Sequence, residues 1–129
     1  MPITRIEVKK CWPPEIQQQF IEATHAAMVE ALNIPEQDKL VRFVEHRPEH
    51  FASPPDTSEN FTLVEVSLFL GRSLEAKRNL YRGIVRRFGE FGIDPKDIRI
   101  VLYEVPLENW GIRGGVPASE VDLGFKVNV

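Results

Sequence analysis

The chain has 129 residues, of which 43% are hydrophobic and 27% charged, and its formal net charge is −3. This composition excludes a disordered chain, and the scattered basic residues and the lack of a roughly 20-residue apolar run argue against nucleic-acid and membrane partners. The single cysteine cannot form an internal disulfide, so we expect a reducing, cytoplasmic location.

Hydrophobic periodicity predicts a strand, a helix and a second strand in the first half of the chain. Residues 3–8 alternate between apolar and polar, as a half-buried strand does. The pair Pro13-Pro14 suits a helix start, where missing N–H groups would be unpaired anyway. Helical spacing then continues over residues 15–32, and Asn33 favours the left-handed conformation that ends a helix. Residues 40–45 are expected to form the second strand.

The same order recurs after a polar, proline-bearing loop at residues 47–60. Residues 62–70 are rich in strand-forming residues, and Ser73 is a suitable N-cap for the helix that follows. We expect Gly92 to end this helix and residues 98–105 to form the fourth strand.

The two halves align at a shift of 59 residues, since residues 34–38 match residues 93–97. We therefore predict one α+β domain over residues 1–129, in which two βαβ repeats form a four-stranded sheet with both helices on one face. The last residues, 121–129, alternate again and predict a fifth, edge or exchanged strand. The expected organisation is a first repeat at 1–51, a loop at 47–60, a second repeat at 61–110 and a tail at 111–129.

The expected strands are apolar on both faces, although two helices cover only one. An uncovered apolar face requires burial against another subunit, so the pattern predicts an oligomer of unspecified order. In the third strand Val64, Val66 and Leu68 lie opposite Leu63 and Phe69, and in the fourth strand Val101, Tyr103 and Val105 lie opposite Ile98, Ile100 and Leu102.

Four stretches of this sequence resemble the tautomerase superfamily, and within it the malonate semialdehyde decarboxylase-like branch. They are Met1 to Ile3, Ile34 to Asp38, Gly71 to Lys77 and Glu108 to Gly111. The resemblance implies a homotrimer with three sheets around a central axis and the helices outside.

The resemblance also implies roles for individual residues. Asp38 matches an aspartate that assists catalysis, Arg72 an arginine that binds the substrate carboxylate, and Trp110 an aromatic wall residue. The decarboxylases carry a second arginine where this chain has Leu70, which argues against decarboxylation. Arg113, where the decarboxylases have no arginine, is a candidate for the missing cation.

Pro2 matches the catalytic amino-terminal proline of the superfamily. Its nitrogen is a tertiary amide until Met1 is removed and a secondary amine afterwards. An unperturbed α-amino group has a pKa of about 7.7–8.0, and both burial and a nearby arginine would lower it. The result would be a base that is free at neutral pH, as enolisation requires. The alternative is that Pro2 simply starts a strand.

The repeat provides a control for the two charged candidates. Arg72 corresponds to Pro13, so the architecture of the repeat does not demand an arginine there, and its position at a helix start favours an anion. Asp38 corresponds to Asp97, and two aspartates at equivalent positions suggest turn chemistry, which leaves a catalytic role for Asp38 open.

We therefore predict a tautomerase that moves a proton on a small keto or aldehyde carboxylic acid without a cofactor or metal. His46 and His50 have a metal-like spacing, but Pro48 between them argues against one helical face. Two alternatives stay open. One is a decarboxylase or hydratase that acts on malonate semialdehyde-like or unsaturated three-carbon acids and needs Asp38. The other is a non-catalytic trimeric binding module.

Overall fold

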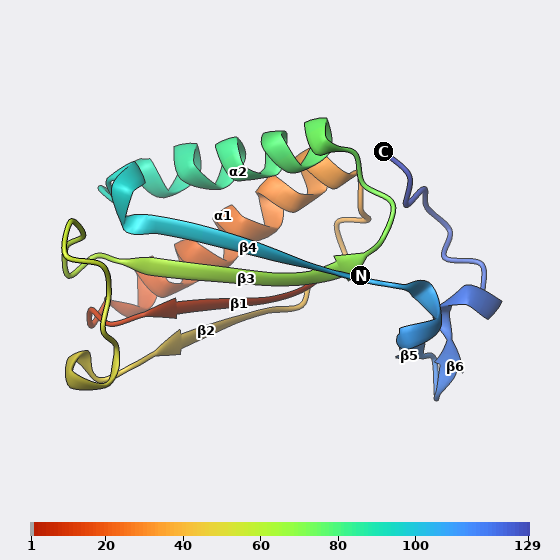
Figure 1. Cartoon of the computed structure of the whole chain (residues 1–129), viewed down its shortest axis with the longest axis horizontal. Coiled ribbons are helices and arrows are strands. Elements are labelled where there is room, and N and C mark those ends of the chain that lie inside the picture. Colours follow the sequence, from red (N-terminus) through yellow and green to blue (C-terminus); the bar gives the residue numbers. More distant parts are fainter. Residues whose placement is uncertain (1) are drawn as a thin grey trace.

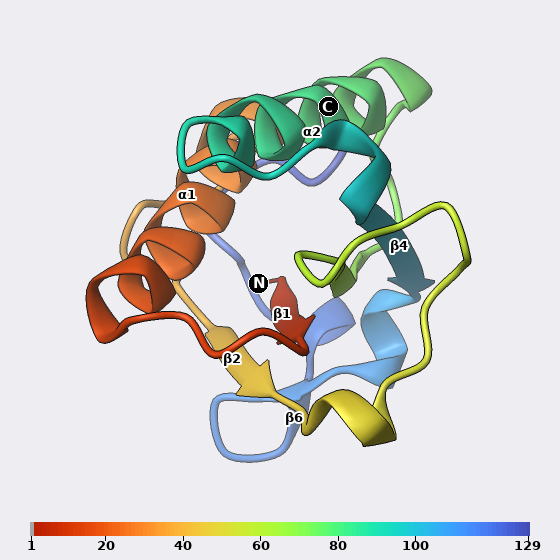
Figure 2. The same ribbon diagram turned by 90° about the vertical axis from the view of Figure 1, so that its left-hand side faces the viewer.

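The computed structural model describes residues 2–129, and in it two helices cover one face of a four-stranded mixed sheet (Figures 1 and 2). This arrangement confirms the predicted α+β fold. Among these residues no helix has the length and hydropathy needed to cross a bilayer. The strands are β1 (Ile3–Val8), β2 (Val41–Glu45), β3 (Thr62–Phe69) and β4 (Ile98–Val105), and the helices are α1 (Pro14–Leu32) and α2 (Leu74–Gly89).

The strand order is β2-β1-β3-β4, with two parallel pairs joined at the centre by an antiparallel pair. Strand β1 pairs in parallel with β2, and β3 with β4, each through a helical crossover. Because β1 and β3 are antiparallel, with Ile3 opposite Ser67, β1 begins at the end of the sheet where β3 finishes. The starts of β1 and β2 therefore meet the turn between β3 and α2.

The core lies between the sheet and the two helices. Phe20 of α1 is fully buried, and its ring meets Phe43 of β2 at 5.2 Å and Phe88 of α2 at 5.1 Å. The helices approach each other closely where Gly83 faces Ala27, since a Cβ atom at Gly83 would lie 3.4 Å from that of Ala27. The alternating strand residues that face the helices are fully buried at Ile6, Val8, Val64, Val66 and Leu68.

The local signals at both helix starts and at the end of α1 are confirmed. Pro13 is the N-cap of α1, and Ser73 accepts a hydrogen bond from the Ala76 amide at the start of α2. Asn33 ends α1 in the left-handed conformation, with φ of 56°. Helix α2, however, ends at Gly89 rather than near Gly92, which lies in the following turn with φ of +89°.

The expectation that residues 121–129 form a fifth or edge strand of the chain's own sheet is wrong. This segment forms neither a strand nor a helix beyond one turn, because its apolar side chains pack against the end of the sheet instead of pairing with a sheet edge. A short two-stranded ribbon precedes it, with β5 at Gly111–Ile112 and β6 at Val116–Pro117. Short 3₁₀ turns occur at Pro48–His50, Pro95–Asp97, Leu107–Asn109 and Ala118–Glu120.

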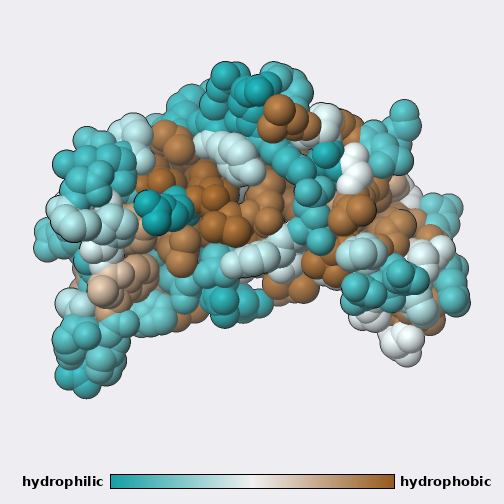
Figure 3. Space-filling view, viewed as in Figure 1, coloured by the Kyte–Doolittle hydropathy of each residue, from teal (hydrophilic) through white to brown (hydrophobic). Residues whose placement is uncertain are grey.

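The open face of the sheet is less apolar than predicted. Its middle carries charges, because Arg5 lies 3.7 Å from the Glu65 carboxylate, which accepts a hydrogen bond from the Tyr103 hydroxyl at 2.9 Å. This hydrogen bond raises the pKa of Tyr103 above its ordinary value. At one end of the face, the chain's own C-terminal segments cover Phe69 completely. Apart from the open face, Figure 3 shows apolar surface in the hollow between α2 and β4.

Asp97, directly before β4, fastens the loop that precedes β3 at the opposite end of the sheet from the start of β1. Its carboxylate accepts hydrogen bonds from the Ser58 amide at 2.7 Å and from the Ser58 hydroxyl at 2.6 Å. Burial alone would raise the pKa of Asp97, but these bonds, with Lys96 and Lys9 nearby, lower it below its ordinary value.

We expect Asp97→Asn to lower the free energy of unfolding by about 1 kcal/mol at pH 7. Because the folded-state pKa lies below the unfolded value of about 3.9, the carboxylate stabilises the fold above that value and loses this effect as the pH falls through the lowered pKa. Urea unfolding between pH 7 and 3 should show the difference from wild type shrinking below pH 4. The exposed Asp56, changed to Asn, is the control; a difference independent of pH would contradict the assignment.

Candidate active site

Three of the site residues predicted from the sequence lie at the end of the sheet where β1 begins. Pro2 is buried and directly precedes β1. The pairing of Ile3 with Ser67 and of Thr4 with Val41 makes Pro2 level with Leu68 on one side and Lys39 on the other. Asp38 and Arg72 lie close to these positions in the chain, so the fold brings the three candidates Pro2, Asp38 and Arg72 to one end of the sheet.

Arg72 is a buried cation with one edge of its guanidinium unused. The side chain is only 5% exposed, and Nη1 donates a hydrogen bond to the Phe69 carbonyl at 3.0 Å. Nε and Nη2 are buried without a hydrogen-bond partner within the described range 2–129. Burial lowers the pKa of Arg72 below its ordinary value, and the charge of Asp38 opposes this shift. Nε and Nη2 together form the edge that binds a carboxylate through two parallel bonds.

Trp110 forms an apolar wall at the same end of the sheet. Its ring meets that of Phe69 edge to face, with 4.8 Å between centroids, and Nε1 donates a hydrogen bond to the Val105 carbonyl at 3.2 Å. Ile3 packs against this aromatic pair, which places the wall beside the start of β1. The wall lowers the local polarity and so strengthens electrostatic interactions nearby.

Asp38 and Asp97 have different surroundings despite their equivalent positions in the two repeats. Asp97 is 1% exposed and bound to Ser58, as described above. Asp38 is half-buried, and its charge acts on the Arg72 guanidinium. Both aspartates end equivalent turns, with the Asp38 amide bonded to the Pro35 carbonyl and the Asp97 amide to the Asp94 carbonyl, but their carboxylates have different surroundings.

Arg113, the candidate for a second cation, lies in the turn between β5 and β6. It is exposed, adopts φ of 48°, and its Nη1 donates a hydrogen bond to the Asp122 carbonyl at 3.1 Å. The structure thus directs this guanidinium toward the C-terminal segment, whereas Arg72 is directed toward the Phe69 carbonyl.

The histidines with metal-like spacing lie elsewhere. His46 meets the Glu7 carboxylate at 2.9 Å, on the open face of the sheet. In the part of the chain that the structure describes, no three histidine, cysteine or acidic side chains are grouped to hold a metal.

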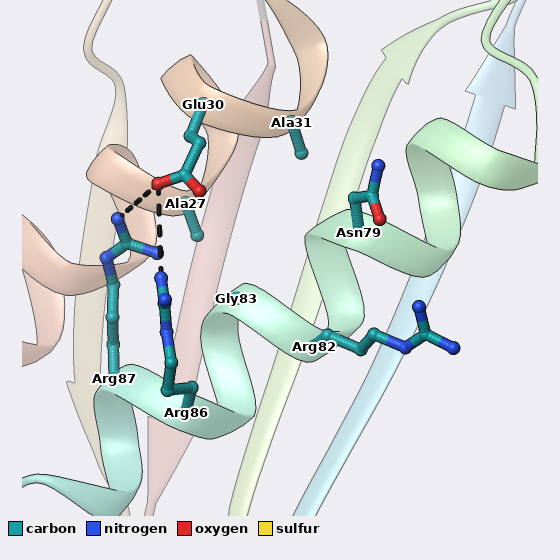
Figure 4. Close-up of a pocket in the computed structure, with 8 residues that line it drawn as sticks. All are labelled: Ala27, Glu30, Ala31, Asn79, Arg82, Gly83, Arg86 and Arg87. Atoms are coloured by element: carbon teal, nitrogen blue, oxygen red, sulfur yellow. Dashed lines mark hydrogen bonds and ion pairs between the residues drawn. The ribbon is translucent and has the colours of Figure 1, made fainter.

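A separate groove of about 320 Å³ runs between the helices on the outer face (Figure 4). Glu30 bridges it, accepting a hydrogen bond from Arg87 at 2.7 Å and lying 3.9 Å from Arg86. The hydrogen bond and the charge of Arg87 lower the pKa of Glu30. The groove contains none of the residues at the start of β1, and two of its arginines, Arg86 and Arg87, already face the Glu30 carboxylate, so we do not assign the active site to it.

Sequence reasoning missed two parts of the site. Phe69 supplies the carbonyl that orients Arg72 and the ring that supports Trp110. The C-terminal segment supplies Phe125, whose ring stacks on that of Phe69 with 6.5 Å between centroids. The alternating apolar residues of the tail were a signal of burial, but they did not specify the surface on which the tail lies.

Two family profiles described as "Tautomerase enzyme" match this chain, one over residues 38–113 and the other over residues 2–58. The first covers more than half of the chain, so the protein belongs to the tautomerase superfamily and is an isomerase-type enzyme of that superfamily. The probable tautomerase YusQ of Bacillus subtilis (strain 168) is 25% identical over 121 residues, which cover 89% of this chain and 95% of YusQ.

Solved structures of the superfamily share the fold. A malonate semialdehyde decarboxylase, described with decarboxylase and hydratase activities, superposes with a TM-score of 0.79 at 24% identity, over 87% of this chain and 92% of that one. A fused 4-OT, described as a symmetric trimer, superposes with a TM-score of 0.78 at 23% identity, over 91% of this chain and 96% of that one. At these identities the likeness shows the fold alone.

Replacing Arg72 by Met tests whether the buried Nε–Nη2 edge of its guanidinium lacks a hydrogen-bond partner in the folded chain. Each buried polar group without a partner costs about 1–3 kcal/mol, so Arg72→Met should leave the free energy of unfolding unchanged or raise it by up to about 2 kcal/mol. The same change should weaken binding of an unreactive carboxylate at least tenfold, measured by calorimetry. Arg87→Met, which breaks the pair with Glu30, is the control and should not stabilise the fold. A large loss of stability in Arg72→Met would instead indicate that the Nε–Nη2 edge has a partner in the folded protein.

Proposed function

We propose that this enzyme interconverts the keto and enol forms of a small carbonyl-containing carboxylic acid, with the amine of Pro2 as general base and acid. The observation that carries the proposal is the unused Nε–Nη2 edge of Arg72, buried at the end of the sheet where Pro2 precedes β1. A buried cation whose bidentate edge has no partner in the described residues favours a carboxylate ligand, and the amine that Pro2 would carry once Met1 is removed, at the same end of the sheet, favours proton transfer on the bound acid.

The proposed chemistry requires the amine to be free at neutral pH. The burial of Pro2 and the charge of Arg72 at the same end of the sheet would each disfavour the ammonium form of a terminal proline. The amine would then remove a proton from the carbon next to the carbonyl, leaving an enolate, and deliver that proton to the enolate oxygen to give the enol; the reverse transfers give the keto form. Arg72 would hold the carboxylate and stabilise the negative charge of the enolate, and Trp110 would exclude water from one side.

A lyase is the second candidate, and the charge of Asp38 acting on Arg72 favours it. An aspartate at this position could activate water for hydration or assist loss of carbon dioxide from a three-carbon acid. Two features favour the tautomerase instead: Leu70 stands where the decarboxylases have an arginine, and Arg113 bonds to the Asp122 carbonyl. Product analysis with malonate semialdehyde distinguishes the two reactions.

We further propose that the chain forms a homotrimer through the open face of its sheet. The half-buried Leu63 and Val101 on this face, together with the trimeric assembly described for the fused 4-OT, support this arrangement. The helices would then face outward. The charged centre of the open face would lie at the interface, where Arg5 and Glu65 could also pair between subunits.

Light scattering should give about three times the chain mass of 14.8 kDa at micromolar concentration. Leu63→Glu places a charge on the proposed interface and should release monomers. Asn79→Glu, on the exposed side of α2, is the matched control and should leave the mass unchanged. A monodisperse wild-type monomer would rule out the trimer.

Pro2→Ala should lower turnover of a 2-keto acid by about 100-fold while preserving the fold, because it replaces a rigid secondary amine by a mobile primary one. In the wild type, activity should rise with pH through the titration of the amine, followed by ultraviolet absorbance of the enol. Intact-mass analysis establishes whether Met1 is absent from each sample. Retention of Met1 should abolish activity because the nitrogen is then an amide. Equal activity with and without Met1 would disprove the Pro2 mechanism.

A further inference from the structure

The C-terminal segment at residues 123–129 lies against the turn that carries Arg72. It runs from the β5–β6 ribbon to the start of α2 (Figure 1). Its last residue, Val129, accepts hydrogen bonds through its backbone oxygen from the Ser73 hydroxyl at 2.8 Å and from the Ser73 amide at 3.4 Å. Phe125 stacks on Phe69 with an angle of 21° between the ring planes. The segment therefore contacts the chain on both sides of Arg72.

The contact is close enough to restrict the sequence of the turn. A Cβ atom at Gly71 would lie 2.5 Å from Oδ1 of Asn128 and 3.1 Å from Cγ1 of Val127, both closer than atoms normally approach. Gly71 also adopts φ of +127°, a conformation that other residues rarely take. The turn thus requires glycine for its own backbone, and a larger residue would also force the Asn128 side chain to move.

Phe69 connects this segment to the guanidinium. Its ring lies between the rings of Phe125 and Trp110, and its carbonyl accepts the hydrogen bond from Nη1 of Arg72. A fixed Phe69 carbonyl fixes Nη1, and because the guanidinium is planar it also fixes the direction of the Nε–Nη2 edge. The orientation of this edge therefore depends on the packing around Phe69.

The same segment also binds the amide and hydroxyl groups of Ser73, which lie at the start of α2 and could otherwise bind an anion. The Ser73 amide donates to Val129, and the Ser73 hydroxyl does the same while accepting from the Ala76 amide. The start of α2 is therefore expected to contribute less to anion binding. Anion affinity should therefore rest mainly on Arg72.

We propose that residues 123–129 form a clamp on the β3–α2 turn, and that Phe125 is the positioning residue through which the clamp orients Arg72 toward the substrate carboxylate. The inference rests on the proposed role of Arg72 as carboxylate ligand. The clamp has no backbone ladder to a strand, so a few side-chain contacts and the two hydrogen bonds to the Val129 oxygen hold it, and loss of the Phe125 contact should free the turn without unfolding the sheet.

The test is Phe125→Ala in the full chain, read by hydrogen exchange and by kinetics. Exchange over residues 69–76, which include the Ser73 amide, should become at least tenfold faster than in the wild type. With a 2-keto acid as substrate, KM should rise about tenfold while kcat stays within twofold, since Arg72 binds the acid and the amine of Pro2 moves the proton. Phe125→Leu, which restores apolar packing, should recover most of the loss in KM.

Phe51→Ala is the matched control, because Phe51 is a half-buried aromatic residue at the opposite end of the sheet, in contact with His46 and Phe61. It should change neither KM nor exchange over residues 69–76. Unchanged exchange in Phe125→Ala would overturn the clamp. Faster exchange with a wild-type KM would overturn the positioning role. If the wild type turned over no keto acid, the proposed function would fail, and hydrogen exchange alone would decide the clamp.

Discussion

The antiparallel pairing of β1 with β3 is the constraint on which the rest of this structure depends. Each βαβ unit is internally parallel, so on its own it would place its strand starts at one end and its helix start at the other. The antiparallel junction reverses one unit relative to the other, with Ile3 opposite Ser67. The start of β1 thereby lies beside the turn between β3 and α2. Pro2 and Asp38 therefore share an end of the sheet with Arg72.

Burial of Arg72 is the energetic consequence at that end. A guanidinium that is 5% exposed and bonded through only one nitrogen to Phe69 opposes folding, and packing elsewhere must offset this cost. The core around Phe20 and the aromatic contacts around Phe69 provide such packing. An anion bound at this edge would reduce that cost, because it would pair the buried charge.

The two repeats diverge at the two ends of the sheet. At one end Asp97 is engaged by Ser58 and fastens a loop. At the other, Asp38 is near enough to Arg72 to influence its charge. The two repeats therefore share one architecture, but one carries an aspartate held by hydrogen bonds within the chain, and the other adjoins a buried donor edge without a partner in residues 2–129.

The sequence by itself determined the strands, the helices and their order, because these depend on interactions between residues close in the chain. Strands Ile3–Val8 and Ile98–Val105 have the predicted bounds, and Pro13, Asn33 and Ser73 end or begin the helices as their local chemistry requires. The shift of 59 residues also indicated the paired architecture. The resemblance to the tautomerase superfamily identified Pro2 and Arg72 as candidates, and the sheet order is what brings them to one end of the sheet.

Only the tertiary structure decided where the irregular segments lie and what each charged group meets. The alternation over residues 121–129 is compatible with a strand and with an irregular segment that buries every second side chain. In the fold, these side chains pack around Phe69, so the segment does not pair with a sheet edge. Arg113 meets Asp122, and Glu65 meets both Arg5 and Tyr103. These partners come from different elements of the fold, and a charged side chain acquires its chemical role from the partners that folding brings within a few ångströms of it.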